Sequence, residues 1–249
     1  MKNYLLLLIA SCAMLNAQAQ VVDAVSLQAT LSDAAGRPDA DKALDVNRKP
    51  AEVLEFLGIE RGMQVVDLIA AAGYYTEVLS HAVGPNGRVY MQNSEAGLSG
   101  ERGARTAVAI EQRLASNRLR NVEIIMATPD ELPLADNSLD AAVIALEFHE
   151  FYLSDNPNAA RDFLQEMRRV LKPGAVLGII DHAGHPVFDP GPLHRVEERR
   201  VVADAQAAGF FVAASGKMLR NIDDDRSRIV FAEGLRRNTD RFVLRAINR

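Results

Sequence analysis

Short runs of apolar residues alternate with amphipathic stretches along most of the chain. Runs rich in Val, Ile and Leu predict buried strands at residues 62–68, 88–93, 121–127, 139–145 and 175–181. Apolar residues that recur every three or four positions predict helices at residues 50–59, 74–84, 103–115, 158–174 and 193–210. Two further strand-like stretches follow at 210–219 and 240–247.

The alternation of strand and helix predicts an α/β domain with a mostly parallel sheet. Pro50 fits the start of its helix, and Gly84 and the segment 172–174 (Lys-Pro-Gly) are typical of helix ends. Ligands of such sheets bind beyond the carboxyl ends of the strands. Those ends are expected at residues 67–73, 93, 128–130, 147–150 and 181–185.

The first nineteen residues have a different pattern. Lys2 precedes an apolar run at 4–15, and residues 17–19 (Ala-Gln-Ala) offer the small residues that a signal peptidase requires. The run is short for a membrane span, so it predicts a signal peptide cleaved after Ala19 and a periplasmic or secreted protein. The segment "IASC" resembles a lipoprotein cleavage box, which leaves a lipid anchor at Cys12 as an alternative.

Composition narrows the function classes. The chain has 249 residues, 48% of them hydrophobic, which suffices for one full core. We expect an N-terminal extension at 20–48, either irregular or made of short helices, and the main domain at 49–249. A net charge of −5 without a basic patch argues against nucleic acid as a partner. Cys12 is the only cysteine, so cleavage after residue 19 leaves no disulfide, thiolate nucleophile or cysteine metal ligand.

Four stretches, covering about residues 50–182, resemble the class I S-adenosylmethionine-dependent methyltransferases: "GMQVVDLIAAAGYYTE", "GPNGRVYMQN", "TPDELPLADNSLDAAVIALEFHEF" and "EMRRVLKPGAVLGIIDH". The C-terminal "LHRVE", "AAGF" and "TDRFVLR" resemble an exported bacterial subfamily of predicted methyltransferases. The resemblance implies a Rossmann-like fold with a mostly parallel seven-stranded sheet whose last strand is antiparallel. It also implies S-adenosylmethionine as cofactor and methyl transfer to a small molecule.

The resemblance implies a cofactor turn at the end of the first strand. The family's first motif resembles D-x-G-x-G-x-G, in which Asp67 and Gly73 match while Ile69 and Ala71 replace glycines. Tyr74, which opens the next helix, is a further candidate for cofactor contact. A β-branched residue is unfavourable at positive φ, and an alanine held there costs about 1 kcal/mol. These two replacements are therefore expected to weaken cofactor binding.

Two more positions depart from the family's cofactor contacts. Asn93 stands where the family usually places an acidic residue for the ribose hydroxyls, and Thr128 stands where it commonly places an Asp for the adenine amine. Both side chains can accept a hydrogen bond, but without the strength that a charge adds. Three weakened contacts would together reduce affinity by roughly two to four powers of ten.

Histidines after the fourth and fifth strands are the candidates for catalysis. His149, followed by Glu150, could act as a general base on an acceptor, and His182 could line the substrate pocket. Asp181, His182, His185 and His194 lie within fourteen residues but match no metal-binding spacing. We therefore expect a polar rim to the cleft rather than a metal site.

Two functions remain open at this point. The first is an exported methyltransferase that acts on a small molecule, an activity that rests on the resemblance. The second is a non-catalytic ligand-binding protein on the same fold with cofactor binding lost, as the replaced glycines suggest. A nicotinamide oxidoreductase is disfavoured because the sequence lacks both a G-x-G-x-x-G turn and an acidic residue after the second strand.

Overall fold

The computed structural model describes residues 20–189 and 191–249. The predicted signal peptide at 1–19 and the alternative lipid anchor at Cys12 lie outside the described residues. Among the described helices, none is both long and apolar enough to cross a membrane.

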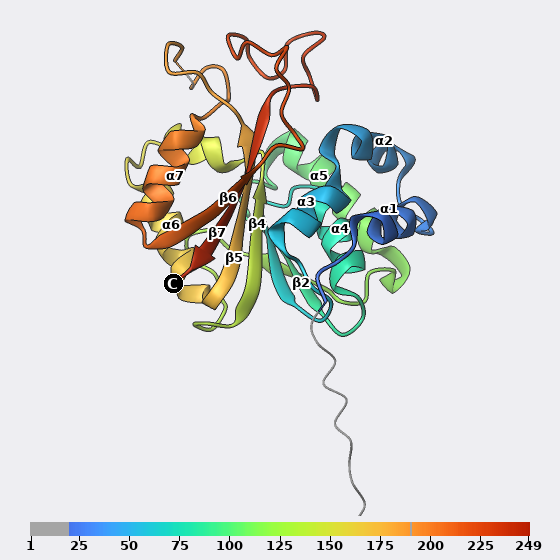
Figure 1. The fold of residues 1–249 in the computed structure, drawn as a ribbon. Coiled ribbons are helices and arrows are strands. Elements are labelled where there is room, and N and C mark those ends of the chain that lie inside the picture. The colour runs from blue at the N-terminus through green and yellow to red at the C-terminus, as the bar shows by residue number, and fades with distance from the viewer. Residues whose placement is uncertain (1–19, 190) are drawn as a thin grey trace, which may run out of the picture.

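A single seven-stranded sheet organises the chain (Figure 1). The strand order is β3-β2-β1-β4-β5-β7-β6. The first five strands pair in parallel, and β7 is antiparallel to both of its neighbours. The expected sheet with an antiparallel last strand is confirmed. The strands are β1 Gln64–Leu68, β2 Arg88–Asn93, β3 Val122–Met126, β4 Leu139–Ala145, β5 Leu171–His182, β6 Phe210–Gly216 and β7 Arg241–Asn248.

Helices cover both faces of the sheet (Figure 1). Successive strand residues point to opposite faces, so Val65 and Val143 join the core under α1, α3 and α4, whereas Val66 and Ile144 join the core under α6 and α7. The helices are α1 Ala24–Asp33, α2 Asp39–Arg48, α3 Pro50–Leu57, α4 Tyr74–Val83, α5 Gly100–Leu114, α6 Ala159–Val170 and α7 Glu198–Ala207, with short 3₁₀ segments η1 Ala115–Asn117 and η2 Phe148–Tyr152.

The stretch expected to be an extension is integrated into the domain. Residues 20–48 form α1 and α2, and the side chain of Asp23 caps α1 by accepting a bond from the Ser26 N–H. Asp45 on α2 makes a buried bidentate pair with Arg37 and also accepts a bond from the Tyr74 hydroxyl at 2.7 Å. Polar contacts therefore fix α2 against the first turn of α4.

Two predicted helices are longer than the observed ones. The helix expected at 158–174 ends at Val170, because Leu171 already pairs with Leu139 and begins β5. The helix expected at 193–210 begins only at Glu198. Residues 191–194 form a turn, and Val196 is bridged to Ala183.

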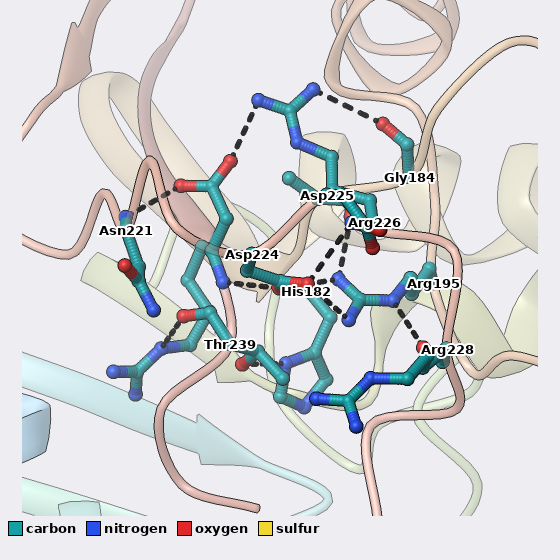
Figure 2. Close-up of polar contacts among 12 residues, drawn as sticks. His182, Gly184, Arg195, Asn221, Asp224, Asp225, Arg226, Arg228 and Thr239 are labelled. Carbon is teal, nitrogen blue, oxygen red and sulfur yellow. Dashed lines mark hydrogen bonds and ion pairs between the residues drawn. The ribbon is translucent and has the colours of Figure 1, made fainter. Parts of the chain in front are cut away.

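Two long loops lie beyond the carboxyl ends of the parallel strands, at the top of Figure 1. One joins β5 to α7, and the other, residues 217–240, joins β6 to β7. Figure 2 shows how they are tied together: Arg195 of the first loop pairs with Asp224 of the second at 3.0 and 3.1 Å. Arg195 also donates to the carbonyls of Ala183 and Arg228. The second loop is thereby held over the end of the sheet.

Candidate functional site

A cavity of about 820 Å³ lies at the carboxyl ends of β1, β4 and β5. That volume is typical of sites for cofactors and drug-sized ligands. Its walls come from the turn after β1, the first turn of α4, α2, and the two loops above the sheet. The residues that line it include Arg48, Asp67, Ile69, Ala71, Tyr74, Tyr75, Leu146, Glu147, His149, Glu150, His182, His194, Val230 and Phe231.

The turn after β1 keeps the backbone form of a glycine turn. Ile69 and Ala71 have φ of 48° and 47°, and Gly73 has φ of 81°. The strained form is held by hydrogen bonds: Gln92 accepts from the Ile69 N–H at 2.7 Å, and Asn93 donates to the Ala71 carbonyl at 3.2 Å. The unfavourable residues at positions 69 and 71 therefore do not reshape the turn.

Strained backbone gathers around this cavity. Besides Ile69 and Ala71, Leu146 and His194 also have positive φ, and all four line the cavity. Such conformations cost about 1–3 kcal/mol each and persist where the surrounding structure imposes them, commonly at functional sites. The concentration of strain here supports a functional role for the cavity.

Replacing Ala71 by glycine is expected to raise the free energy of unfolding by about 1 kcal/mol, because glycine adopts positive φ without steric cost. Urea denaturation measures this change. Ala70→Gly is the matched control, because Ala70 has no positive φ and the change should destabilise by up to about 1 kcal/mol. Equal effects of the two substitutions would contradict strain at position 71.

Only some of the residues predicted to bind cofactor reach the cavity. Asp67, Ala71 and Tyr74 line it, whereas Gly73, Asn93 and Thr128 do not. A Cβ on Gly73 would lie 2.8 Å from Met91 Cε, so this glycine serves close packing. The side-chain amide of Asn93 donates its hydrogen bond to the Ala71 carbonyl of the turn. The cofactor roles of these residues remain predictions.

Two carboxyl groups on the cavity wall, the buried Asp67 and the partly buried Glu147, can carry negative charge. Burial raises the pKa of Asp67 to about 7, although hydrogen bonds from the Thr76 hydroxyl and N–H oppose the shift. Burial likewise raises the pKa of Glu147 to about 7, against the attraction of His149. Both groups thus change charge near neutral pH.

Tyr74 and Tyr75 are both buried, with 8% and 4% of their surface exposed. Their rings meet edge to face at 5.2 Å, because α2 covers this turn of α4 and Asp45 binds the Tyr74 hydroxyl. Both rings still line the cavity.

His149 is held by the carboxylate of Asp181. Its Nδ1 lies 2.9 Å from one Asp181 oxygen, and its backbone N–H donates to the other at 2.7 Å. Burial lowers the pKa of His149, but the hydrogen bond and charge of Asp181 with the nearby Glu150 and Glu147 outweigh it, so the net shift is upward. This arrangement makes His149 a stronger base and fixes its ring.

His182 has the opposite electrostatic setting. Burial lowers its pKa well below the usual value, and the positive charges of His149, Arg241 and Arg195 add to the effect. Its Nδ1 lies 2.7 Å from the Thr239 hydroxyl (Figure 2). His182 is therefore a neutral hydrogen-bonding group at the wall of the cavity.

Glu150 joins two imidazoles. Its Oε1 lies 2.9 Å from His194 Nδ1 and 3.1 Å from His149 Nε2. One ligand atom from each of the three residues lies within 4.8 Å of the others, so this group could also share a metal ion. His185, which the sequence placed near this rim, instead packs on Phe188 in the β5–α7 loop. The contact of Glu150 with His194 is a hydrogen bond, and its contact with His149 is a close approach of a carboxylate to an imidazole.

Sequence reasoning missed several residues of this site. It placed Asp181 at a strand end but did not pair it with His149, although parallel strands β4 and β5 are neighbours. It also missed Arg48 at the end of α2 and Phe231 in the β6–β7 loop. Phe231 belongs to a short apolar run at 229–232 inside a segment rich in charged residues, and that run is the one sequence signal that could have drawn attention to the loop.

Comparisons with known proteins agree with this geometry. A family model described as a methyltransferase domain matches residues 72–179. The ubiquinone/menaquinone biosynthesis C-methyltransferase UbiE of Pseudomonas fluorescens is 27% identical over 194 residues, which cover 78% of this chain and 66% of that protein. The chain therefore contains a methyltransferase domain, and its sequence is similar to S-adenosylmethionine-dependent methyltransferases. It spans about two thirds of the length of the curated family members it matches.

Solved methyltransferase structures share the fold. A SAM-dependent methyltransferase from Aquifex aeolicus superposes with a TM-score of 0.59 at 24% identity, over 91% of this chain and 99% of that one. A TehB-like SAM-dependent methyltransferase from Corynebacterium glutamicum gives a TM-score of 0.52 at 13% identity, over 80% and 87% of the two chains. At these identities the likeness concerns the methyltransferase fold alone.

Proposed function

We propose that this protein is an exported methyltransferase that uses S-adenosylmethionine to methylate a small molecule whose acceptor atom carries a proton. The observation that carries the proposal is that a turn of glycine-type geometry and a buried His149–Asp181 pair belong to one site. The family supplies the cofactor class, and the cavity supplies room for a cofactor beside an acceptor.

The residues present fit the proposed cofactor. S-adenosylmethionine carries its transferable methyl group on a positively charged sulfonium. Asp67 and Glu147 offer negative charge on the cavity wall once they ionise, and Tyr75 offers an aromatic surface. The positive φ of Ala71 lets the backbone of the turn remain close to the cavity, and the N-terminus of α4 favours a carboxylate. These residues would hold the cofactor.

The chain's own contribution would be alignment and proton removal. The acceptor would displace the Glu150 carboxylate, which lies 3.1 Å from His149 Nε2, and that nitrogen would then accept its proton while Asp181 holds Nδ1 and stabilises the resulting imidazolium. His182 stays neutral and can orient the acceptor by hydrogen bonding. Alignment in a cavity that excludes water supplies much of the rate enhancement in transfers of this kind.

Calorimetric titration of the protein from residue 20 onward tests the cofactor proposal. We expect S-adenosylmethionine and S-adenosylhomocysteine to bind with micromolar Kd, and tritiated methyl groups to reach a member of a small-molecule panel. The absence of heat and of any thermal shift at millimolar ligand would favour the alternative, a binding protein on the same fold.

Cofactor binding is expected to depend on pH. Between about pH 6 and pH 8 the carboxyl groups of Asp67 and Glu147, each with a pKa of about 7, lose protons and gain negative charge. The Kd of S-adenosylmethionine should therefore fall with rising pH by roughly tenfold. Titrations across this range measure the slope. S-adenosylhomocysteine, which lacks the sulfonium charge, is the control and should change less, and Glu147→Gln should flatten the dependence. A flat profile in the unmodified protein would contradict this electrostatic role.

Export is the part of the proposal that rests on sequence alone. Its support is the positive charge of Lys2, the short apolar run at 4–15 and the small residues at 17–19. Mass spectrometry of the protein recovered from the producing cell tests it. We expect a mature chain that begins at Gln20 in the periplasm or medium. A lipidated Cys12 at the N-terminus would favour the anchored form, and retention of Met1 in the cytoplasm would contradict export.

A further inference from the structure

A second, smaller cavity of about 240 Å³ adjoins the main one. It shares Arg48, Leu146, His182 and Phe231 with the main cavity, but it includes none of residues 67–75. It therefore lies away from the predicted cofactor turn. Four arginines line it, and we call it the arginine pocket: Arg48, Arg236, Arg237 and Arg241.

The arginines of this pocket have no acidic partners among residues 20–189 and 191–249. No carboxylate oxygen in that part of the chain lies within 4.0 Å of any of the four guanidinium groups, although fifteen of the salt bridges there involve other arginines or a lysine. Arg48 lies 4.3 Å from the ring centre of Tyr74 instead. In a chain with net charge −5, four clustered and unpaired cations need another explanation.

Arg241 is the strongest evidence for a bound anion, because only 6% of its surface is exposed. Its Nη2 donates to the neutral carbonyl of Asn47 at 2.6 Å, and the nearby Asp240 carboxylate, whose charge acts to raise the pKa of Arg241, is already paired with Arg220 and Arg226. Burial lowers the pKa of Arg241, and the positive potential at this point also contributes to the low pKa of His182. A buried cation without a counter-charge is costly, so its retention indicates an anion in the functional state.

The rest of the pocket wall is apolar. Leu44, Leu146, Val230 and Phe231 line it together with the arginines. Phe231 is 58% exposed, lines both cavities and lies beside the ring of His194, so it can cover a bound ligand. The combination matches a molecule with an anionic end and an apolar body.

We propose that the arginine pocket binds the carboxylate or phosphate of the methyl acceptor, which is therefore a small amphipathic anion. That the bound anion is the methyl acceptor rests on the proposed function, whereas the binding of an anion by the arginines does not. Guanidinium groups suit both oxyanions because their planar forks donate paired hydrogen bonds. The shared His182 and Leu146 would place the apolar body of the anion toward His149.

Calorimetric titration of the full chain with three probes tests the pocket. Benzoate and phenyl phosphate carry the two anions, and benzamide has the same ring without charge. We expect one of the anions to bind about tenfold or more tightly than benzamide, since charged hydrogen bonds are worth that much. The tighter anion distinguishes a carboxylate from a phosphate ligand. Equal binding of benzoate, phenyl phosphate and benzamide, or no binding of either anion at millimolar concentration, would overturn the proposal.

Variants locate the binding. Arg236→Gln combined with Arg237→Gln alters two exposed side chains, so folding should be unaffected and anion affinity should fall about tenfold. Arg241→Gln should have at least as large an effect, with thermal denaturation to show that it folds. Arg161→Gln, an exposed arginine of α6, is the matched control and should bind as the unmodified protein does. Unchanged affinity in the double variant would refute the pocket.

Competition separates this inference from the proposed function. Anions should bind equally well with and without saturating S-adenosylhomocysteine. Competition between them would mean that the arginines hold the cofactor's own carboxylate, which would overturn the inference. Failure of S-adenosylhomocysteine to bind, with benzoate still bound through the arginines, would refute the methyltransferase proposal and leave the anion pocket standing.

Discussion

The His149→Ala variant is expected to have a kcat for methyl transfer that is lower by a factor of about 10² to 10⁴, which is the usual contribution of a positioned general base. The loss should appear with whichever acceptor accepts tritiated methyl groups from the unmodified enzyme. The Kd of S-adenosylhomocysteine should stay within about twofold, because the removed ring acts on the acceptor. His185→Ala is the matched control: its ring packs on Phe188, so kcat should not change.

The pH profile distinguishes a base from a packing residue. His149 acts as a base only when its ring is neutral. Burial lowers the pKa of His149, but the negative charges of Asp181, Glu150 and Glu147 raise it by more, so the pKa lies above the usual value. The rate should therefore rise with pH to a plateau above that pKa. Asp181→Asn removes the charge that raises it, so the rise should move to lower pH and the plateau should fall. Full activity in His149→Ala would eliminate this histidine as the base.

Much of the fold follows from local pattern. The strands at 88–93 and 139–145 were predicted to the residue, because buried parallel strands are continuous apolar runs bounded by turns. The bounds of α2 escaped prediction because six of its ten residues are polar or charged, and its place is fixed by the Arg37–Asp45 pair instead of an apolar stripe. Contacts of that kind join distant residues and leave no periodicity.

The site was predictable only in part for the same reason. Parallel strands end at one edge, so the sequence could bring Asp67, His149 and His182 to one region. It could not show that Asn93 turns its amide to the Ala71 carbonyl, since that depends on the form of a neighbouring turn. Nor could it place Arg48 and Arg241 together, because an N-terminal helix and a C-terminal strand meet only in the folded protein.

The Arg195→Ala variant is expected to lower the free energy of unfolding by about 3–5 kcal/mol, because it leaves the buried Asp224 carboxylate without its partner. The side chains of Arg195 and Asp224 are 0% and 1% exposed, and Asp224 also accepts the Asp240 N–H at 2.7 Å. Urea denaturation measures the loss. Arg199→Ala, which breaks an exposed pair with Glu197, should change stability by no more than about 0.5 kcal/mol.

A double variant tests whether charge is the cause. Arg195→Met with Asp224→Asn removes both charges while an amide oxygen remains to accept the Asp240 N–H, so it should recover much of the stability that Arg195→Ala loses. The same pair, drawn in Figure 2, ties the β6–β7 loop to the β5–α7 loop, and Val230 and Phe231 of the β6–β7 loop line the cavity. Trypsin should therefore cleave Arg195→Ala fastest within 217–240. Slow cleavage there, together with an unchanged unfolding curve, would mean that the loop is held by its other contacts.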